Sequence, residues 1–395
     1  MTARPIDIRP VGRASLPDSG LGRGWEPAAL MGLTLLVLSV GLVTLYSASS
    51  VFAIRQGLPD TFYALRQAAG AGVGLVVLTV CALMPYRYWA RVAWPLIALT
   101  TFLLLLCVLP WTYGIAPEIN GARRWLSLGV RFQPSEIAKI AIVVWTATLA
   151  VKKQESFSSL RRGLLPFFVV WAAMIGLVMA APDLSTAMVL AVLGVVVVFS
   201  AGARIAHFVF LGVLVAPLIW LQLRVGFRLE RLRAFAAIFR DPLGNADAGG
   251  YQVKQSLVAF GSGGINGVGI GEGRQKYGFL PESHNDFIFA MIGEEWGLMG
   301  VLLLIGLYAA VVLVGFRIAG RAPDLFGELI AIGFSSLIAV QAVFHMSVGL
   351  ALAPATGLAL PLVSYGRSNL VITLAALGIL ISVARAAPGG KAARV

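Results

Sequence analysis

Four ionisable side chains lie close together where a polar loop of the chain runs into an apolar stretch. They are Glu282, His284, Asp286 and Glu294. A carboxylate at such a boundary, partly removed from water, becomes a stronger proton acceptor and can serve as a general base. Aspartate is also a favoured residue for capping the start of a helix, and that role needs no chemistry. From the residues alone, both roles of Asp286 stay open.

Three arginines cluster in a second polar segment that precedes another apolar stretch. Arg123, Arg124 and Arg131 fall within nine residues of one another. Guanidinium groups match the oxygens of phosphate, so a phosphorylated or pyrophosphorylated substrate is one interpretation. Pairing with lipid headgroups is the alternative.

A charged pair enters the apolar stretch directly after these arginines. Glu136 and Lys139 are three residues apart, so in a helix they share a face and can pair near the membrane edge. Pro134 and Ser135 before them are typical of a helix start. Two roles of Glu136 and Lys139 remain open: they cap the start of the helix, or they form a functional charge pair. Charges inside a membrane helix favour the functional role.

The same reasoning excludes several classes of site. The three histidines, His207, His284 and His345, are too scattered for a metal-ligand signature. The two cysteines lie in separate apolar runs, and the glycines of 261–273 lack the Gly-Lys-Ser/Thr of a phosphate-binding loop. The sequence therefore predicts neither a metal centre nor an ATP-driven machine.

The composition indicates what must position these residues. Of 395 residues, 58% are hydrophobic and 12% are charged, whereas soluble domains carry about 25% charged residues. A chain of this size cannot enclose so much apolar surface, so the sequence predicts an all-α polytopic membrane protein. The formal net charge of +13 is explained by anionic lipids and by basic cytoplasmic connections, and we expect no nucleic-acid partner.

Apolar stretches of about 20 residues predict ten membrane helices. They are placed at 28–52, 66–84, 91–110, 134–151, 164–181, 184–200, 204–223, 287–315, 326–351 and 369–386. Ten spans put both termini on one side, and lysine and arginine in the short connections of that side make it cytoplasmic. We expect cytoplasmic tails at 1–25 and 388–395 and a single membrane domain at 26–387.

Three connections on the opposite side are too long to be simple turns, and function is expected there. They are 111–133, 224–286 and 352–368. The longest is a large extracytoplasmic loop between the seventh and eighth helices. It begins with an amphipathic stretch that includes Arg228, Leu229 and Phe239 and continues into the glycine-rich centre. This pattern is typical of a segment that lies on the membrane surface.

Four motifs in the right order resemble the SEDS family (shape, elongation, division, sporulation). They are Asn120-Gly-Ala-Arg-Arg-Trp with Gln133-Pro-Ser-Glu-Ile-Ala-Lys, Pro182-Asp-Leu-Ser-Thr, Leu280-Pro-Glu-Ser-His-Asn-Asp-Phe-Ile-Phe-Ala and Pro361-Leu-Val-Ser-Tyr-Gly. The resemblance extends over residues 28–386. Gly267-Val-Gly-Ile-Gly, Gln275-Lys and Ala290-Met-Ile-Gly-Glu-Glu are more similar to the division branch of the family than to its elongation branch.

The resemblance implies a peptidoglycan glycosyltransferase in the bacterial cytoplasmic membrane. Such an enzyme polymerises lipid II at the outer face of the membrane and releases undecaprenyl diphosphate, here in septal wall synthesis during cell division. The implied partners are a transpeptidase-only penicillin-binding protein, other divisome or elongasome membrane proteins, and membrane lipids. A lipid II flippase and a noncatalytic scaffold that activates a penicillin-binding protein are the two alternative functions.

The resemblance also assigns roles to residues. The family's essential carboxylate aligns with Asp286, its paired arginines with Arg123 and Arg124, and its conserved Glu and Lys with Glu136 and Lys139. The resulting hypothesis is that Asp286 takes the proton of the acceptor sugar while the cationic groups hold the pyrophosphate. A divalent cation, Mg²⁺ or Mn²⁺, can share that charge, and no other cofactor is expected. The predicted substrate-binding residues further include Glu282, His284 and Ser364.

The chain departs from the family pattern at a few positions. Ser-Tyr-Gly-Gly-Ser-Ser is usual where this chain carries Arg367 and Asn369, and Thr is common where it has Asn285. Gly278 stands where many members of the division branch have Glu, and His345 stands where Asn is usual. Arg367 is either an additional phosphate contact or a plain surface residue.

Overall fold

The computed structural model describes residues 24–119, 121–157, 159–209 and 248–387, with a few further positions between 212 and 237. Its helices are α1 (Glu26–Arg55), α2 (Phe62–Leu83), α3 (Arg87–Val108), α4 (Pro134–Lys153), α5 (Leu165–Ala180), α6 (Leu184–Ser200), α9 (Ala248–Gly263), α10 (Ile288–Glu295), α11 (Gly297–Gly320), α12 (Leu325–Gly349) and α13 (Arg367–Ala386). Short turns of helix are η1 (Gln154–Ser156), η2 (Leu160–Leu164) and η3 (Gln275–Tyr277). Strands β1 (Leu126–Leu128) and β2 (Val130–Phe132) form an antiparallel hairpin in which Leu126 pairs with Phe132.

The described part of the chain confirms an all-α polytopic membrane fold. Eight of its helical segments are long and apolar enough to cross a membrane: α1 to α4, α5 together with the preceding turn η2 (Leu160–Ala180), and α11 to α13. Helix α6 is equally apolar but shorter, at 17 residues. Much of the span predicted at 204–223 lies outside the described residues, as do Arg228 and Phe239 of the predicted amphipathic stretch.

The span predicted at 287–315 is wrong in one respect, because the structure divides it into two helices. Helix α10 ends at Glu295, and α11 starts at Gly297 and runs to Gly320. Gly297 has a φ of 67°, which glycine adopts without the steric penalty that a side chain incurs. Apolar residues flank the break on both sides, although Glu294 and Glu295 directly precede it, so a search for hydrophobic stretches reads both helices as one.

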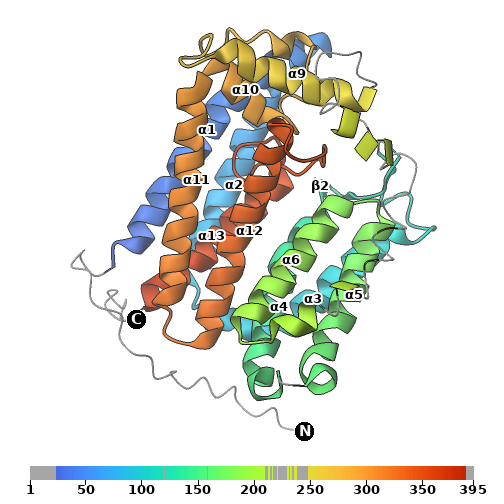
Figure 1. Cartoon of the computed structure of the whole chain (residues 1–395), viewed down its shortest axis with the longest axis vertical. Helices are drawn as coiled ribbons and strands as arrows, with labels where there is room; N and C mark the ends of the chain where they lie inside the picture. Colours follow the sequence, from blue (N-terminus) through green and yellow to red (C-terminus); the bar gives the residue numbers. More distant parts are fainter. Residues whose placement is uncertain are drawn as a thin grey trace.

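Helix α13 packs against α2 more extensively than any other two described helices pack against each other (Figure 1). Glycines allow the two backbones to approach: a Cβ atom on Gly378 would overlap the carbonyl oxygen of Leu78, and one on Gly74 would overlap the side chain of Leu374. Close approach through small residues is the usual way in which membrane helices associate. Helix α12 joins this group to the remaining helices, because it packs on α11 and also on α4 and α6.

Ion pairs fix one end of the helix bundle, the end at which α1 begins and α13 ends. Glu26 pairs with Arg317 at 3.1 Å and with Arg321 at 2.5 Å, and Asp324 pairs with Arg87 at 3.0 Å. The hairpin, α9, α10 and the loop before α13 lie at the opposite end (Figure 1). The long connections predicted to carry function therefore gather at that end.

Candidate functional site

Asp286 lies in a tight turn between η3 and α10. The main-chain N–H groups of Asn285 and Asp286 both donate to the carbonyl oxygen of Glu282 at 3.0 Å. Glu282 has a φ of 54°, a left-handed conformation that is uncommon for residues other than glycine and is concentrated at functional sites. Phe287, and not Asp286, occupies the N-cap position of α10. The capping role that sequence left open for Asp286 is thus not the one that the structure gives it.

The loop between α12 and α13 holds this turn from the other side. The Ser364 hydroxyl donates to the carbonyl oxygen of Asn285 at 2.7 Å and accepts from the N–H of Leu360 at 2.9 Å. The N–H of Tyr365 donates to the carbonyl oxygen of His284 at 3.1 Å. Ser364 is buried beside the aspartate turn, and its predicted role in substrate binding stays a prediction. These bonds fix the backbone that carries the carboxylate.

A glycine brings the same loop close to the carboxylate itself. A Cβ atom on Gly357 would lie 3.6 Å from Oδ2 of Asp286, and Gly357 has a φ of 73°. His345 supports this stretch from α12, because its Nδ1 bonds the carbonyl oxygen of Leu358 at 2.7 Å. Two of the three predicted functional connections therefore meet at Asp286.

His284 is enclosed by aromatic rings. Its ring centroid lies 4.7 Å from that of Phe52, 5.2 Å from that of Tyr63 and 6.0 Å from that of Tyr365. Burial lowers the pKa of His284 to about 4, because a charged imidazole loses its hydration among these rings. The side chain is therefore neutral at neutral pH. Its surroundings indicate that it orders the turn by packing.

Glu136 and Lys139 form a buried ion pair in the first turns of α4. Lys139 Nζ lies 2.6 Å from Glu136 Oε2, and the two side chains are only 2% and 9% exposed. Asn369 Nδ2 donates to the same carboxylate oxygen at 3.0 Å. The pairing predicted from spacing is confirmed. One departure from the family pattern, Asn369, completes the pair's hydrogen bonding from α13.

Arg123 and Arg124 make contacts that sequence reasoning did not anticipate. Arg123 donates to the carbonyl oxygens of Ala116 and Leu109 at 3.0 and 2.8 Å and to the Thr112 hydroxyl at 2.7 Å. Arg124 donates to the carbonyl oxygens that precede α6, including that of Ala181 at 3.1 Å. In this geometry the guanidinium groups hold the connection between α3 and α4 in shape. Their contact with a phosphate stays a prediction.

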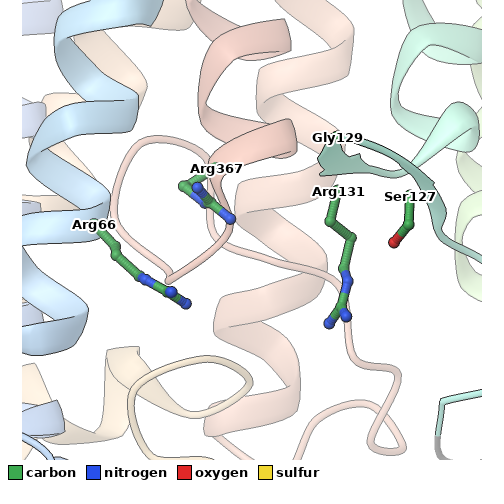
Figure 2. A pocket seen from close by; sticks show the side chains of 5 residues that line it. All are labelled: Arg66, Ser127, Gly129, Arg131 and Arg367. Atoms are coloured by element: carbon green, nitrogen blue, oxygen red, sulfur yellow. The ribbon is translucent and has the colours of Figure 1, made fainter.

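Other arginines line a hollow at the same end of the molecule. The hollow has a volume of about 440 Å³ and is lined by Arg66, Ser127, Gly129, Arg131 and Arg367. Figure 2 shows the three guanidinium-bearing side chains around one space, coming from α2, the hairpin and the start of α13. Arg66 was missed by sequence reasoning because it stands at the edge of an apolar span, far along the chain from the other arginines. Only the packing of α2 on α13 brings them together.

The carboxylates of α10 are hydrogen-bonded inside the fold, and Glu295 also has an ion-pair partner. Glu294 accepts from the N–H of Arg274 at 2.9 Å. Glu295 accepts from the Ser47 hydroxyl at 2.5 Å and lies 3.6 Å from Lys276 Nζ. Both carboxylates are buried and tie the glycine-rich loop to α1 and α10. They belong to the short helix before the break, not to the membrane span in which sequence placed them.

The departure at Gly278 follows from backbone geometry. Gly278 has a φ of 94°, and a Cβ atom there would overlap the guanidinium group of Arg55. Arg55 in turn donates to the carbonyl oxygen of Tyr277. A side chain at this position requires both a strained backbone and a displaced arginine.

Comparison with known proteins adds to this geometry. The sequence model of the cell cycle proteins FtsW, RodA and SpoVE matches residues 28–388. The chain belongs to this family. The family resemblance predicted from the four motifs is confirmed.

Two curated members of the FtsW/RodA/SpoVE family illustrate the likeness over nearly the full chain. Stage V sporulation protein E of Bacillus subtilis is 39% identical over 90% of this chain and 96% of its own length. The probable peptidoglycan glycosyltransferase FtsW of Trichlorobacter lovleyi is 40% identical over 90% of this chain and 92% of its own length.

Solved structures of the FtsW/RodA/SpoVE family share the fold. A chain from a peptidoglycan synthase complex that coordinates polymerization and crosslinking is 30% identical, with a TM-score of 0.71 over 92% of this chain and 98% of that one. The rod shape determining protein RodA of Thermus thermophilus is 29% identical, with a TM-score of 0.64 over 93% and 98% of the two chains. This chain is therefore a multi-pass membrane protein of the family.

Proposed function

We propose that this chain is a peptidoglycan glycosyltransferase that polymerises lipid II at the outer face of the bacterial cytoplasmic membrane. The names of the curated relatives support the enzyme class. The observation that carries the proposal for the site is the fixed position of the Asp286 turn. Hydrogen bonds from Ser364 and Tyr365 hold it at the end of the bundle opposite the start of α1 and the end of α13. General acid–base catalysis requires a carboxylate held in this way.

In the proposed reaction, Asp286 accepts the proton of the acceptor sugar's 4-hydroxyl. The acceptor oxygen forms a bond to the anomeric carbon of the donor sugar while the bond from that carbon to the pyrophosphate oxygen breaks. The electron pair leaves with undecaprenyl diphosphate, and the anomeric configuration inverts. Positive charge near the departing oxygens stabilises this transition state because negative charge develops there.

The remaining site residues support this step in different ways. Glu136 orients Lys139 and so fixes the position of its ammonium group near the start of α4. Arg123 and Arg124 shape the neighbouring connection through their carbonyl contacts. The roles of Glu282, His284 and Ser364 are to build the turn that carries Asp286 and to border the bound sugars.

A divalent cation enters the proposal only as a companion of the pyrophosphate. Within the described ranges, no three His, Cys, Asp or Glu side chains gather closely enough to hold a metal ion. We therefore assign no side chain of these ranges as a metal ligand. The likeness to a chain of a peptidoglycan synthase complex supports a penicillin-binding protein with transpeptidase activity as the partner, in septal wall synthesis.

The test is polymerisation by the purified chain, alone and with its cognate penicillin-binding protein. Lipid II is supplied in detergent with Mg²⁺ or Mn²⁺, and glycan strands are resolved on gels. Asp286→Asn should lower the rate by about 10²- to 10⁴-fold, the contribution of a positioned general base. Glu272→Gln is the matched control, because Glu272 is an exposed carboxylate of the loop before η3.

Three outcomes distinguish the functions. Strands from the parent chain and the control but not from Asp286→Asn support a polymerase that uses this base. Equal rates in all three proteins contradict the role of Asp286. A folded chain that binds lipid II and its partner but makes no strands contradicts the polymerase and favours the flippase or the scaffold.

A further inference from the structure

The hollow lined by Arg66, Arg131 and Arg367 carries an unusual concentration of positive charge. Its five lining residues include three arginines and no carboxylate. Across the described ranges, none of the three guanidinium groups has a carboxylate within ion-pair distance. The guanidinium group of Arg66 lies over the ring of Phe62, with its Cζ atom 4.2 Å from the ring centroid. By contrast, Arg123 and Arg124 are engaged by carbonyl oxygens.

Hydrogen bonds at the start of α13 fix the three arginines relative to one another. Gln67, next to Arg66, donates to the carbonyl oxygen of Ser364 at 3.0 Å and accepts from the N–H of Gly366 at 3.2 Å. The N–H of Gln133, two residues after Arg131, donates to the Ser368 hydroxyl at 3.3 Å. Both neighbours of Arg367 are thus joined to the segments that carry the other two arginines.

The stem of Arg367 is itself held in place. A Cβ atom on Gly70 would lie 3.1 Å from Cγ of Arg367, so this arginine packs over a bare stretch of α2, one helical turn beyond Arg66. Its guanidinium group extends from there into the hollow (Figure 2). Arg367 is exposed, but its stem is packed on α2 and its guanidinium group shares the hollow with those of Arg66 and Arg131.

The electrostatics of this arrangement favour an anion. Three like charges around one hollow repel each other, and a phosphate group among them replaces that repulsion by attraction. Guanidinium groups bind phosphate oxygens through pairs of hydrogen bonds. Helix α13 begins at Arg367 with no side-chain cap, so the positive end of its dipole adds to the field. The volume of about 440 Å³ falls within the range of small-molecule sites, about 300–1,000 Å³.

We propose that Arg66, Arg131 and Arg367 form a binding site for the phosphate groups of a lipid, in the first place the pyrophosphate of a polyprenyl-linked substrate or product. The site lies beside the reaction centre, because the loop that starts α13 at Arg367 also bonds the Asp286 turn through Tyr365. This inference rests on the proposed function for the identity of the lipid. The anion site itself rests only on the geometry of the arginines.

The test measures binding without turnover. The full chain is placed in nanodiscs of phosphatidylcholine, and the binding of undecaprenyl pyrophosphate is measured with inorganic pyrophosphate as the competitor. Arg367→Gln and Arg131→Gln should each weaken binding about tenfold or more, the effect of losing one charge-assisted hydrogen bond. Arg274→Gln is the control, because it removes the same charge from an exposed arginine at the same end of the molecule. A second set of nanodiscs contains phosphatidylglycerol in place of part of the phosphatidylcholine.

Each outcome decides a different part of the proposal. Selective weakening in the two pocket variants supports the site. If phosphatidylglycerol competes as well as pyrophosphate does, the anion site stands and its occupant is a phospholipid headgroup. The proposed anion site is overturned if Arg367→Gln and Arg131→Gln leave binding unchanged, or if Arg274→Gln weakens binding as much as they do. A chain that binds pyrophosphate but makes no glycan contradicts the proposed function and leaves this site intact.

Discussion

The buried pair of Glu136 and Lys139 permits a quantitative prediction. Lys139→Met removes the ammonium group and keeps an unbranched side chain of similar length. Glu136 then remains buried with the Asn369 amide as its hydrogen-bond donor in the described structure. The substitution therefore tests what an unpaired carboxylate costs inside the membrane domain.

The magnitude follows from the distance between the charges. At the 2.6 Å separation of Lys139 Nζ and Glu136 Oε2, an effective dielectric constant of about 20 gives an attraction of about 6 kcal/mol. Removing one partner of such a buried pair typically costs about 3–5 kcal/mol, because the desolvation of the other remains without compensation. We expect Lys139→Met to lower the free energy of unfolding by that amount.

The double variant Glu136→Gln, Lys139→Met separates the ion pair from simple packing. It removes both charges and keeps a side chain that can accept the hydrogen bond of Asn369, so we expect a loss of less than about 2 kcal/mol. The coupling energy of the two substitutions is then at least about 1 kcal/mol and favourable to the pair. The double variant should be more stable than Lys139→Met alone.

Reversible unfolding in mixed micelles, driven by titration with a denaturing detergent, measures these free energies. Lys152→Met is the matched control, because Lys152 lies at the other end of α4 and is not buried. If Lys139→Met lowers the free energy of unfolding no more than Lys152→Met does, the reasoning from a buried pair is refuted. The reasoning from a coupled pair is refuted if the separate losses measured for Lys139→Met and Glu136→Gln add up to the loss in the double variant.

Three further predictions concern the turn and its surroundings. Burial holds the pKa of His284 at about 4, so the unfolded chain binds a proton at a higher pH than the native chain does. The free energy of unfolding should therefore fall by up to about 3 kcal/mol as the pH drops from about 6.5 to 4. Thermal melts should show this slope reduced in His284→Phe, and an unchanged slope contradicts it. Ser364→Ala removes the bonds that link Leu360 and Asn285, so glycan synthesis should fall about tenfold while the stability loss stays near 1–2 kcal/mol; full activity on gels contradicts a positioning role. Asp183 caps α6 by accepting from the Thr186 N–H at 3.1 Å, so Asp183→Ala should cost about 1 kcal/mol in melts and Asp183→Ser should restore most of it.

The sequence predicted the features that depend on local spacing. Apart from the span at 287–315, apolar runs located the described membrane helices to within a few residues, because the thickness of the bilayer sets their length. The pairing of Glu136 with Lys139 followed from helical periodicity.

Features that depend on distant parts of the chain escaped sequence reasoning. The hollow combines Arg66 with Arg367, about 300 residues apart, and only helix packing shows that they are neighbours. The break at Gly297 was missed because long apolar stretches flank it on both sides, although Glu294 and Glu295 directly before it were a signal. The carbonyl contacts of Arg123 and Arg124 were also missed, since residue type indicates what a guanidinium group can bind but not which acceptor reaches it first.

The packing of α13 on α2 has a consequence for how the protein is made. Ribosomes deliver α2 to the membrane long before α13 emerges, so the face of α2 that carries Gly70 and Gly74 must wait in lipid for its partner. The contacts to Gln67, to Asn285 and to Glu136 all come from residues 364–369. The site is therefore assembled only when the final helix has inserted. A chain that ends before residue 364 retains most of its membrane helices but lacks the hydrogen bonds that hold the proposed reaction centre, so we expect it to be inactive.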